Sequence, residues 1–210
     1  MNLPEDIRAM PLAEVVDSII HLNWGITAFW KSPRGWAPME VADLLSRSRL
    51  DWQFALSKTL HLWVHDYDSQ DEGRLILAWV NLGALVEGSL KWFLSVFYDN
   101  YREDVEAIRD KEKKLVEPDS RSASFDRLRR FFEKGIWVDH EKGFGNCVQT
   151  IQQRRNAIHA YKSREIGTFL EFEECVRFYL ALLRSLNSRA PYPAMPPSEE
   201  EFAVGSGGDE

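Results

Sequence analysis

A short polar stretch near the end of the chain, QQRRNAIHAYKSR, concentrates residue types that can act on a phosphate. A histidine titrates near neutral pH and can pass protons as a general base or acid. A guanidinium can hold non-bridging phosphate oxygens and stabilise growing negative charge, and an asparagine or tyrosine can orient the attacking group. If the nucleophile is an RNA 2′-hydroxyl, this chemistry needs no metal and no cofactor. The candidate catalytic residues are Arg154, Arg155, Asn156, His159 and Tyr161.

The spacing of these residues predicts a helix that separates them into two groups. Arg155 and His159 lie about 40° apart at one border of the apolar face, and Arg154 and Tyr161 lie about 20° apart at the other. Arg154 and His159 are then about 140° apart, so one straight helix does not bring them together. Either the helix is distorted near His159, or a second copy of the chain supplies the missing partner. An ordinary polar border of an amphipathic helix explains the same composition. The predicted apolar face comprises Phe144, Cys147, Val148, Ile151 and Ile158.

A second group of candidates suggests metal binding. His61 and His65 are four residues apart, a spacing that can present two imidazoles to one metal ion, and Asp66 and Asp68 follow. No glutamate follows His61 as in a zinc-protease helix, and the sequence offers no evident third ligand. The pattern therefore favours an ordinary helix end, and we expect no metal site.

Glu87 and Lys91 have the favourable i,i+4 spacing, with the glutamate first, inside a largely apolar segment. Because a lone buried charge is costly, the two side chains are expected to pair. They are either a structural ion pair or a support that lines a functional cleft.

The elements that position these candidates are all predicted to be helices, because apolar residues recur with helical periodicity and no segment alternates as a strand does. Pro38 suits a first helical position, and Thr168 with Glu171 has the spacing of a capping box. The sequence predicts an all-α helical bundle. Its expected helices cover about 12–30, 38–65, 74–101, 124–135, 146–162 and 168–186.

Bulk properties place this bundle in one domain. The 210 residues carry a net charge of −7, which argues against a surface that coats nucleic acid but leaves room for a local basic cleft. We expect N-terminal helices in 1–71 to pack on a bundle core in 72–189, followed by a mobile tail in 190–210.

The sequence also predicts where the chain resides. Its two cysteines lie inside helical patterns and its first residues do not resemble a signal peptide, so a reduced, cytoplasmic protein is expected. The apolar stretch from Leu75 to Tyr98 is interrupted by Asn81, Glu87 and Lys91, which predicts a buried helix and no membrane association.

The segment RRNAIHAY resembles the R-x-x-x-x-H-x-Y signature of HEPN domains, with Arg154, His159 and Tyr161 in register. The stretches NLGALVEGSLKWFLSVFYDNY and RNAIHAYKSREIGTFLEFEE resemble segments of bacterial HEPN-like proteins, so the resemblance extends from about Glu72 to Ser188. It implies an antiparallel helical bundle of a kind that often dimerises, which places two motif copies across a shared cleft. The N-terminal helices would be an elaboration of that bundle.

The resemblance also implies an activity. Active HEPN proteins are metal-independent endoribonucleases, found as toxins and in phage-defence systems. By analogy His159 would be the acid/base, Arg154 the phosphate binder, and Tyr161 an orienting residue or the site at which a nucleotidyltransferase antitoxin blocks a toxin.

The chain departs from the family pattern beside the motif arginine. Many members have a polar residue directly after that arginine, whereas here Arg155 follows Arg154 and Asn156 comes one position later. The resemblance selects Arg154 as the catalytic arginine, and i,i+4 spacing to His159 selects Arg155. The leading hypothesis is a homodimeric endoribonuclease that acts in bacterial toxin or antiviral defence systems. The alternative is a catalytically inactive HEPN-like module that dimerises or serves as a scaffold in a defence complex.

Overall fold

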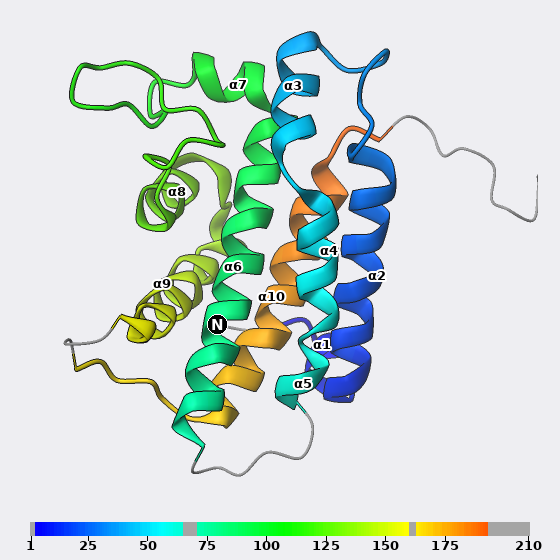
Figure 1. Cartoon of the computed structure of the whole chain (residues 1–210), viewed down its shortest axis with the longest axis vertical. Coiled ribbons are helices and arrows are strands. Elements are labelled where there is room, and N and C mark those ends of the chain that lie inside the picture. The colour runs from blue at the N-terminus through cyan, green and yellow to red at the C-terminus, as the bar shows by residue number, and fades with distance from the viewer. Residues whose placement is uncertain (1–2, 65–70, 160–162, 193–210) are drawn as a thin grey trace, which may run out of the picture.

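The computed structural model describes residues 3–64, 71–159 and 163–192, and within these ranges the chain is all-α, with no strand. Four helices form the centre of the bundle (Figure 1): α2 (Leu12–Trp30), α4 (Leu50–Lys58), α6 (Glu72–Val96) and α10 (Phe169–Arg189). In that view the chain runs upward in α2, α6 and α10 and downward in α4. The predicted fold class, an all-α helical bundle, is confirmed.

A second group of helices covers the other side of α6. It contains α8 (Phe125–Phe131), a π-helical turn (η1, Phe132–Ile136), a short 3₁₀ turn (η2, Asp139–Glu141) and α9 (Gly143–Arg155). Helix α9 packs against α6, α8 and α10, so α6 lies between the N-terminal helices and the motif helix (Figure 1). Two short helices complete these parts of the chain: α1 (Glu5–Ala9) packs against α10, and α7 (Tyr98–Glu103) follows α6.

Local sequence signals explain where the two longest helices begin. The Asp71 side chain accepts a hydrogen bond from the backbone N–H of Arg74 at 2.9 Å and thereby caps α6. The predicted capping box of α10 is confirmed: Thr168 Oγ1 accepts from the N–H of Glu171 at 3.2 Å, and Glu171 Oε2 accepts from the N–H of Thr168 at 2.9 Å.

The segment predicted as one helix over 38–65 is three helices, so that prediction was wrong. Helix α3 (Met39–Arg47) ends before Arg49, whose backbone is left-handed with φ 51°, and α5 (His61–Val64) is a separate turn. The hydroxyls of Ser48, Ser57 and Thr59 donate to carbonyls of their own helices, a competition that disfavours a continuous helix.

The predicted helix over 74–101 is likewise interrupted. The backbone leaves helical geometry at Phe97, between α6 and α7, although α6 begins slightly earlier than expected. Beyond α7, residues 104–124 form an irregular segment that contains one isolated β-bridge between Arg109 and Leu115.

All these helices share one hydrophobic core, which extends from Ile7 in α1 to Ala190 after α10. One polar cluster crosses its centre, with one residue from each central helix. Ser89 lies 3.0 Å from the Tyr179 hydroxyl, and Asn23 and Gln53 each donate to that hydroxyl at 3.5 Å. Complete burial raises the pKa of Tyr179, which therefore stays protonated.

The C-terminal part is packed at least as far as Tyr192, whose ring lies 5.0 Å from Phe29 and 5.6 Å from Trp30 between centroids. The remainder of the predicted mobile tail lies outside the described residues. Across those residues, no helix combines the length and apolar character that a membrane crossing requires.

Candidate functional site

The motif helix is shorter than predicted, which changes how its side chains are presented. Helix α9 ends at Arg155, Asn156–Ile158 form a 3₁₀ turn (η3), and His159 is extended with φ −81° and ψ 109°. The prediction of a helix to 162 was wrong. Seven further helical residues would carry the chain about 10 Å onward, whereas the partners of Arg154 lie on the returning segment and on α10.

Of the two geometric alternatives, distortion before His159 is present in the single chain. The helical angles therefore apply as far as Arg155 but not to His159. Ile158, predicted to continue the buried face, is 49% exposed for the same reason. Tyr161 lies outside the described residues.

Arg154 is enclosed by carboxylates from the segment that follows the motif. Its side chain is 12% exposed, with Nη1 3.3 Å from Glu165 Oε2 and Nη2 3.7 Å from Glu171 Oε2. Its Nε is buried and has no hydrogen-bond partner among the described residues. Gly167 passes close to this guanidinium with φ 69°, and a Cβ there would lie 3.1 Å from Arg154 Nε. We call Arg154, Glu165 and Glu171 the Arg154 centre; one positive and two negative groups give it a net charge of −1.

Arg155 points to the opposite side, onto α6. Its Nη1 pairs with Glu87 Oε2, and Lys91 Nζ lies 2.9 Å from Glu87 Oε1. We call these three residues the Arg155 centre; two positive groups and one negative group give it a net charge of +1. Gly83 makes the approach possible, because a Cβ there would lie 2.6 Å from Arg155 Cδ. The Arg155 guanidinium also lies 5.4 Å from the centre of the Phe125 ring.

The carboxylate of the Arg155 centre is held ionised. Burial alone would raise the pKa of Glu87, but hydrogen bonds from Arg155 and Lys91 outweigh burial and lower that pKa below its ordinary value. The predicted Glu87–Lys91 pair is therefore present, and it contacts the motif directly through Arg155.

His159 is presented differently from both arginines. His159 is exposed, and within the described residues its side chain has no hydrogen bond or ion pair. The preceding η3 packs against α6, the helix that carries Glu87 and Lys91 of the Arg155 centre. His159 is the next residue after η3. An exposed imidazole that none of the described residues contacts through a hydrogen bond or ion pair is available to an incoming group.

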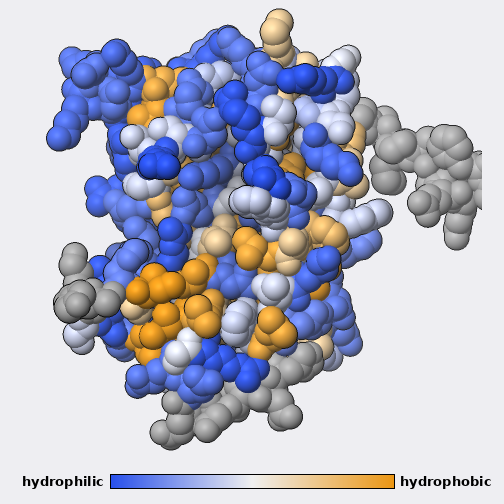
Figure 2. Space-filling view, in the orientation of Figure 1, coloured by the Kyte–Doolittle hydropathy of each residue, from blue (hydrophilic) through white to orange (hydrophobic). Residues whose placement is uncertain are grey.

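An exposed apolar surface adjoins this part of the chain. On α6 it recurs with helical spacing, with Leu77 half exposed and with Ile76, Val80 and Ala84 partly exposed, and Ile158 borders it from η3. Figure 2 shows apolar side chains gathered in the lower half of this face, over α6 and beside it. We call these five residues the α6 surface.

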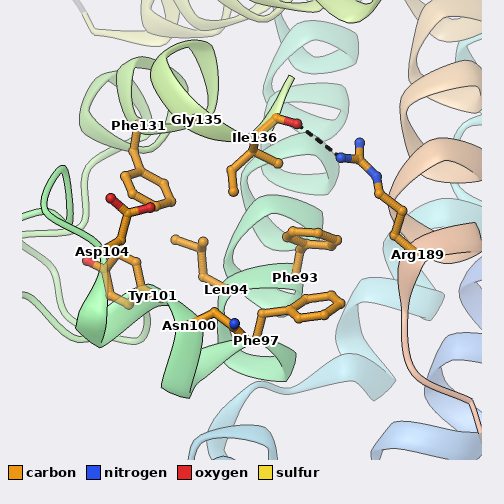
Figure 3. A pocket seen from close by; sticks show the side chains of 10 residues that line it. All are labelled: Phe93, Leu94, Phe97, Asn100, Tyr101, Asp104, Phe131, Gly135, Ile136 and Arg189. Atoms are coloured by element: carbon orange, nitrogen blue, oxygen red, sulfur yellow. Dashed lines mark hydrogen bonds between the residues drawn. The ribbon is translucent and has the colours of Figure 1, made fainter. Parts of the chain in front are cut away.

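Two hollows lie away from His159. One, of about 220 Å³, lies between α3, α4 and α6 and includes Lys91 in its lining. The other, of about 350 Å³, is lined mostly by aromatic and aliphatic side chains around α6, α7 and the π-helical turn, with Asp104 and Arg189 on opposite sides (Figure 3). Arg189 is engaged there, donating to the Ile136 carbonyl at 3.0 Å. Neither hollow contains a motif arginine or His159.

The metal alternative receives no geometric support. His61 Nε2 lies 3.0 Å from Asp17 Oδ1 on α2, and His65, Asp66 and Asp68 lie outside the described residues. Over the parts of the chain that are described, no group of three or more His, Cys, Asp or Glu side chains could hold a metal ion.

Comparison of the chain with protein-family models, curated proteins and solved structures finds no match. Three contributions to the site were missed by the sequence reasoning. Glu165 and Glu171 had no signal beyond the capping box, and Gly83 resembled any other glycine in an apolar helix. A glycine facing a predicted arginine-bearing helix is a signal that could have been used.

Proposed function

We propose that this chain is a metal-independent endoribonuclease of the HEPN type that acts as a homodimer. His159 is the acid/base, and Arg155, supported by Glu87 and Lys91, binds the phosphate. The observation that carries the proposal is the exposed His159, whose side chain has no partner among the described residues and which lies one short turn beyond Arg155 and its positively charged centre.

In this mechanism the histidine activates the substrate's own 2′-hydroxyl. His159 removes the 2′-proton, the 2′-oxygen bonds to the adjacent phosphorus, and the bond from phosphorus to the 5′-oxygen breaks. The departing 5′-oxygen receives a proton from an imidazolium, for which His159 of a second copy is available in a dimer. The products are a 2′,3′-cyclic phosphate and a 5′-hydroxyl. Arg155 stabilises the charge that grows on the non-bridging oxygens.

Electrostatics favour Arg155 over Arg154 as the phosphate ligand. A phosphodiester that approaches the Arg154 centre meets two carboxylates and a net charge of −1, which repel it. At the Arg155 centre it meets a net charge of +1, and the Arg155 side chain is 32% exposed. We therefore assign Arg154 to the structure of the returning segment, and Asn156, in η3 between Arg155 and His159, to orientation of the substrate. The motif resemblance alone would assign Arg154 to the phosphate.

The α6 surface supports the dimer. A contiguous apolar face rimmed by polar groups is typical of an interaction surface, and this one borders the segment that carries His159. A second copy seated on it would bring two His159 side chains to one cleft. Toxin or antiviral activity, and control by a nucleotidyltransferase antitoxin that modifies Tyr161, remain part of this proposal.

The direct test is RNA cleavage by the purified chain in EDTA, with the cyclic phosphate ends identified by mass spectrometry. We expect His159→Ala and Arg155→Ala each to reduce the rate at least about 100-fold. Arg164→Ala serves as the matched control, because Arg164 is exposed and close in sequence. Cleavage by His159→Ala at the wild-type rate would refute the assignment.

Mixing the two inactive variants tests whether the site is shared between copies. If His159 of one copy acts with Arg155 of the other, and one His159 suffices for both proton transfers, a mixed dimer of His159→Ala and Arg155→Ala chains regains one working site. If both residues act within one copy, or if the leaving oxygen requires the second His159, the mixture stays inactive. Leu77→Glu, placed on the α6 surface, should shift sedimentation toward the monomer.

One observation favours a second candidate, a silent module that only dimerises or serves as a scaffold. Both motif arginines already pair with carboxylates, so phosphate must compete with an existing partner. A stable dimer that cleaves neither structured nor single-stranded RNA would select this alternative.

A further inference from the structure

The two cysteines of the chain meet across the contact between α9 and α10. Cys147 Sγ lies 3.3 Å from Cys175 Sγ, and both are free thiols. The residues are 28 positions apart in sequence, so the fold, and not local chain geometry, brings the sulfurs together. A disulfide has an S–S distance of about 2.05 Å, so the two sulfurs must approach each other by little more than 1 Å for the bond to form.

The pair lies beside an open groove. Cys147 is partly exposed and Cys175 is buried, and both residues line this groove, whose volume is about 1030 Å³. The groove gives a small oxidant an approach to Cys147, whose thiol is itself largely buried. Charged groups on the groove come from two elements, Arg8 of α1 and Glu171, Glu173, Glu174 and Arg177 of α10.

We propose that Cys147 and Cys175 form an oxidation site, at which hydrogen peroxide converts the two thiols into one intramolecular disulfide that links α9 to α10. This proposal does not depend on the nuclease activity.

The reaction has two balanced steps. The Cys147 thiolate attacks one peroxide oxygen, an S–O bond forms, the O–O bond breaks, and the departing hydroxide takes up the proton that the thiol released. The Cys175 sulfur then attacks the resulting sulfenic acid, the S–S bond forms, the S–O bond breaks, and the second hydroxide leaves as water with the Cys175 proton. The two thiols lose two electrons and two protons in total, and the peroxide becomes two water molecules.

The environment of Cys147 makes this reaction slow near neutral pH. Burial raises the pKa of the Cys147 thiol well above its ordinary value, and contact with Cys175 and the charge of Glu174 raise it further. Since the thiolate is the nucleophile, the rate of oxidation should rise with pH throughout the mildly alkaline range.

The disulfide would restrain the Arg154 centre. Cys147 lies about two helical turns before Arg154 on α9, and Cys175 lies about one turn after Glu171 on α10. The disulfide would thus add a second connection between the two helices, about one to two turns away from the Arg154–Glu171 ion pair. The last turn of α9 should then open less often.

The test is treatment of the purified full chain with hydrogen peroxide, followed by alkylation under denaturing conditions and mass spectrometry. We expect loss of two hydrogens, no alkylated cysteine, a melting temperature raised by roughly 5–10 °C, and slower amide exchange at the end of α9. Dithiothreitol should reverse all four changes. Cys147→Ser and Cys175→Ser should each retain the untreated melting temperature after peroxide.

Three outcomes would overturn the proposal. Both thiols could remain alkylatable after prolonged treatment at alkaline pH. The mass could rise by added oxygen without an internal cross-link, or the disulfide could join two chains, which a non-reducing gel would reveal. Cys147→Ala supplies a second variant if the serine changes disturb folding.

Discussion

The Arg154 centre and the Arg155 centre begin at adjacent residues yet differ in almost every physical respect. The first is formed by the returning segment and the start of α10, is 12% exposed at its arginine and carries net negative charge. The second is formed on α6, is more exposed and carries net positive charge. Two adjacent arginines thus have opposite electrostatic surroundings. A residue's match to a sequence motif therefore does not determine its chemical role. The folded neighbours determine it.

The largest effect on stability is expected for Arg154→Ala, which tests the structural role of the Arg154 centre. The change removes a nearly buried side chain and leaves Glu171 without its cationic partner, so we expect a loss of about 2–3 kcal/mol in the free energy of unfolding. Urea denaturation measures it. Arg164→Ala, an exposed arginine in the same segment, should change that free energy by less than about 0.5 kcal/mol. Equal effects of the two changes would contradict a structural role for Arg154.

Gly83→Ala tests the close packing that admits Arg155. The new methyl group would lie 2.6 Å from Arg155 Cδ and 3.1 Å from its Cβ, so we expect a loss of about 1–2 kcal/mol and displacement of the arginine. Gly25→Ala in α2 is the matched control, because no atom of the described residues outside the adjoining backbone of its own helix lies within 4 Å of the position of its Cβ. That control should be neutral or stabilising by up to about 1 kcal/mol. A Gly83→Ala protein as stable as Gly25→Ala would disprove the steric argument.

Glu87→Gln tests whether the ionised carboxylate of the Arg155 centre stabilises the fold, through the pH dependence of stability. Because the folded state lowers the pKa of Glu87, its ionised form stabilises the fold at pH values above the ordinary glutamate range, and this contribution is lost as pH falls through the folded pKa. We expect Glu87→Gln to cost about 1 kcal/mol at pH 7. The difference from wild type should shrink when denaturation is repeated in progressively more acidic buffers. A difference that is constant with pH would show that ionisation of Glu87 contributes nothing.

The smallest expected effect on stability comes from His159→Ala. The imidazole is exposed and has no hydrogen bond or ion pair with any described residue, so the free energy of unfolding should change by less than about 0.5 kcal/mol. Thermal denaturation of His159→Ala, with Arg155→Ala measured for comparison, gives this change in stability. A large loss would mean that His159 is structural, and would remove the reason to assign it a catalytic role.

Much of the fold could be predicted from helical periodicity and caps. The limits of α2 and the capping box of α10 were predicted correctly because they depend on residues close in sequence. The breaks at Arg49 and Phe97 were missed, since hydroxyls that bond to backbone carbonyls and a single non-helical residue leave the apolar pattern intact.

The candidate site was predictable in composition but not in arrangement. The pairing of Glu87 with Lys91 follows from their spacing, whereas the contact of Glu87 with Arg155 joins residues 68 positions apart. The end of α9 at Arg155 depends on where the following segment places Glu165 and Glu171 against Arg154. No local sequence pattern encodes that placement. The pattern of residue types therefore indicated which side chains matter, and tertiary contacts decided how they are divided.

The Tyr179 hydroxyl has a consequence for the alignment of the central helices. Because Asn23, Gln53 and Ser89 all reach it from separate helices, a slide of any one helix by a single turn of about 5.4 Å would leave a polar group stranded among aliphatic side chains. Apolar residues alone would tolerate several such alignments, because hydrophobic contacts are not directional. One phenol at the centre of the bundle therefore fixes how four helices are aligned along their axes.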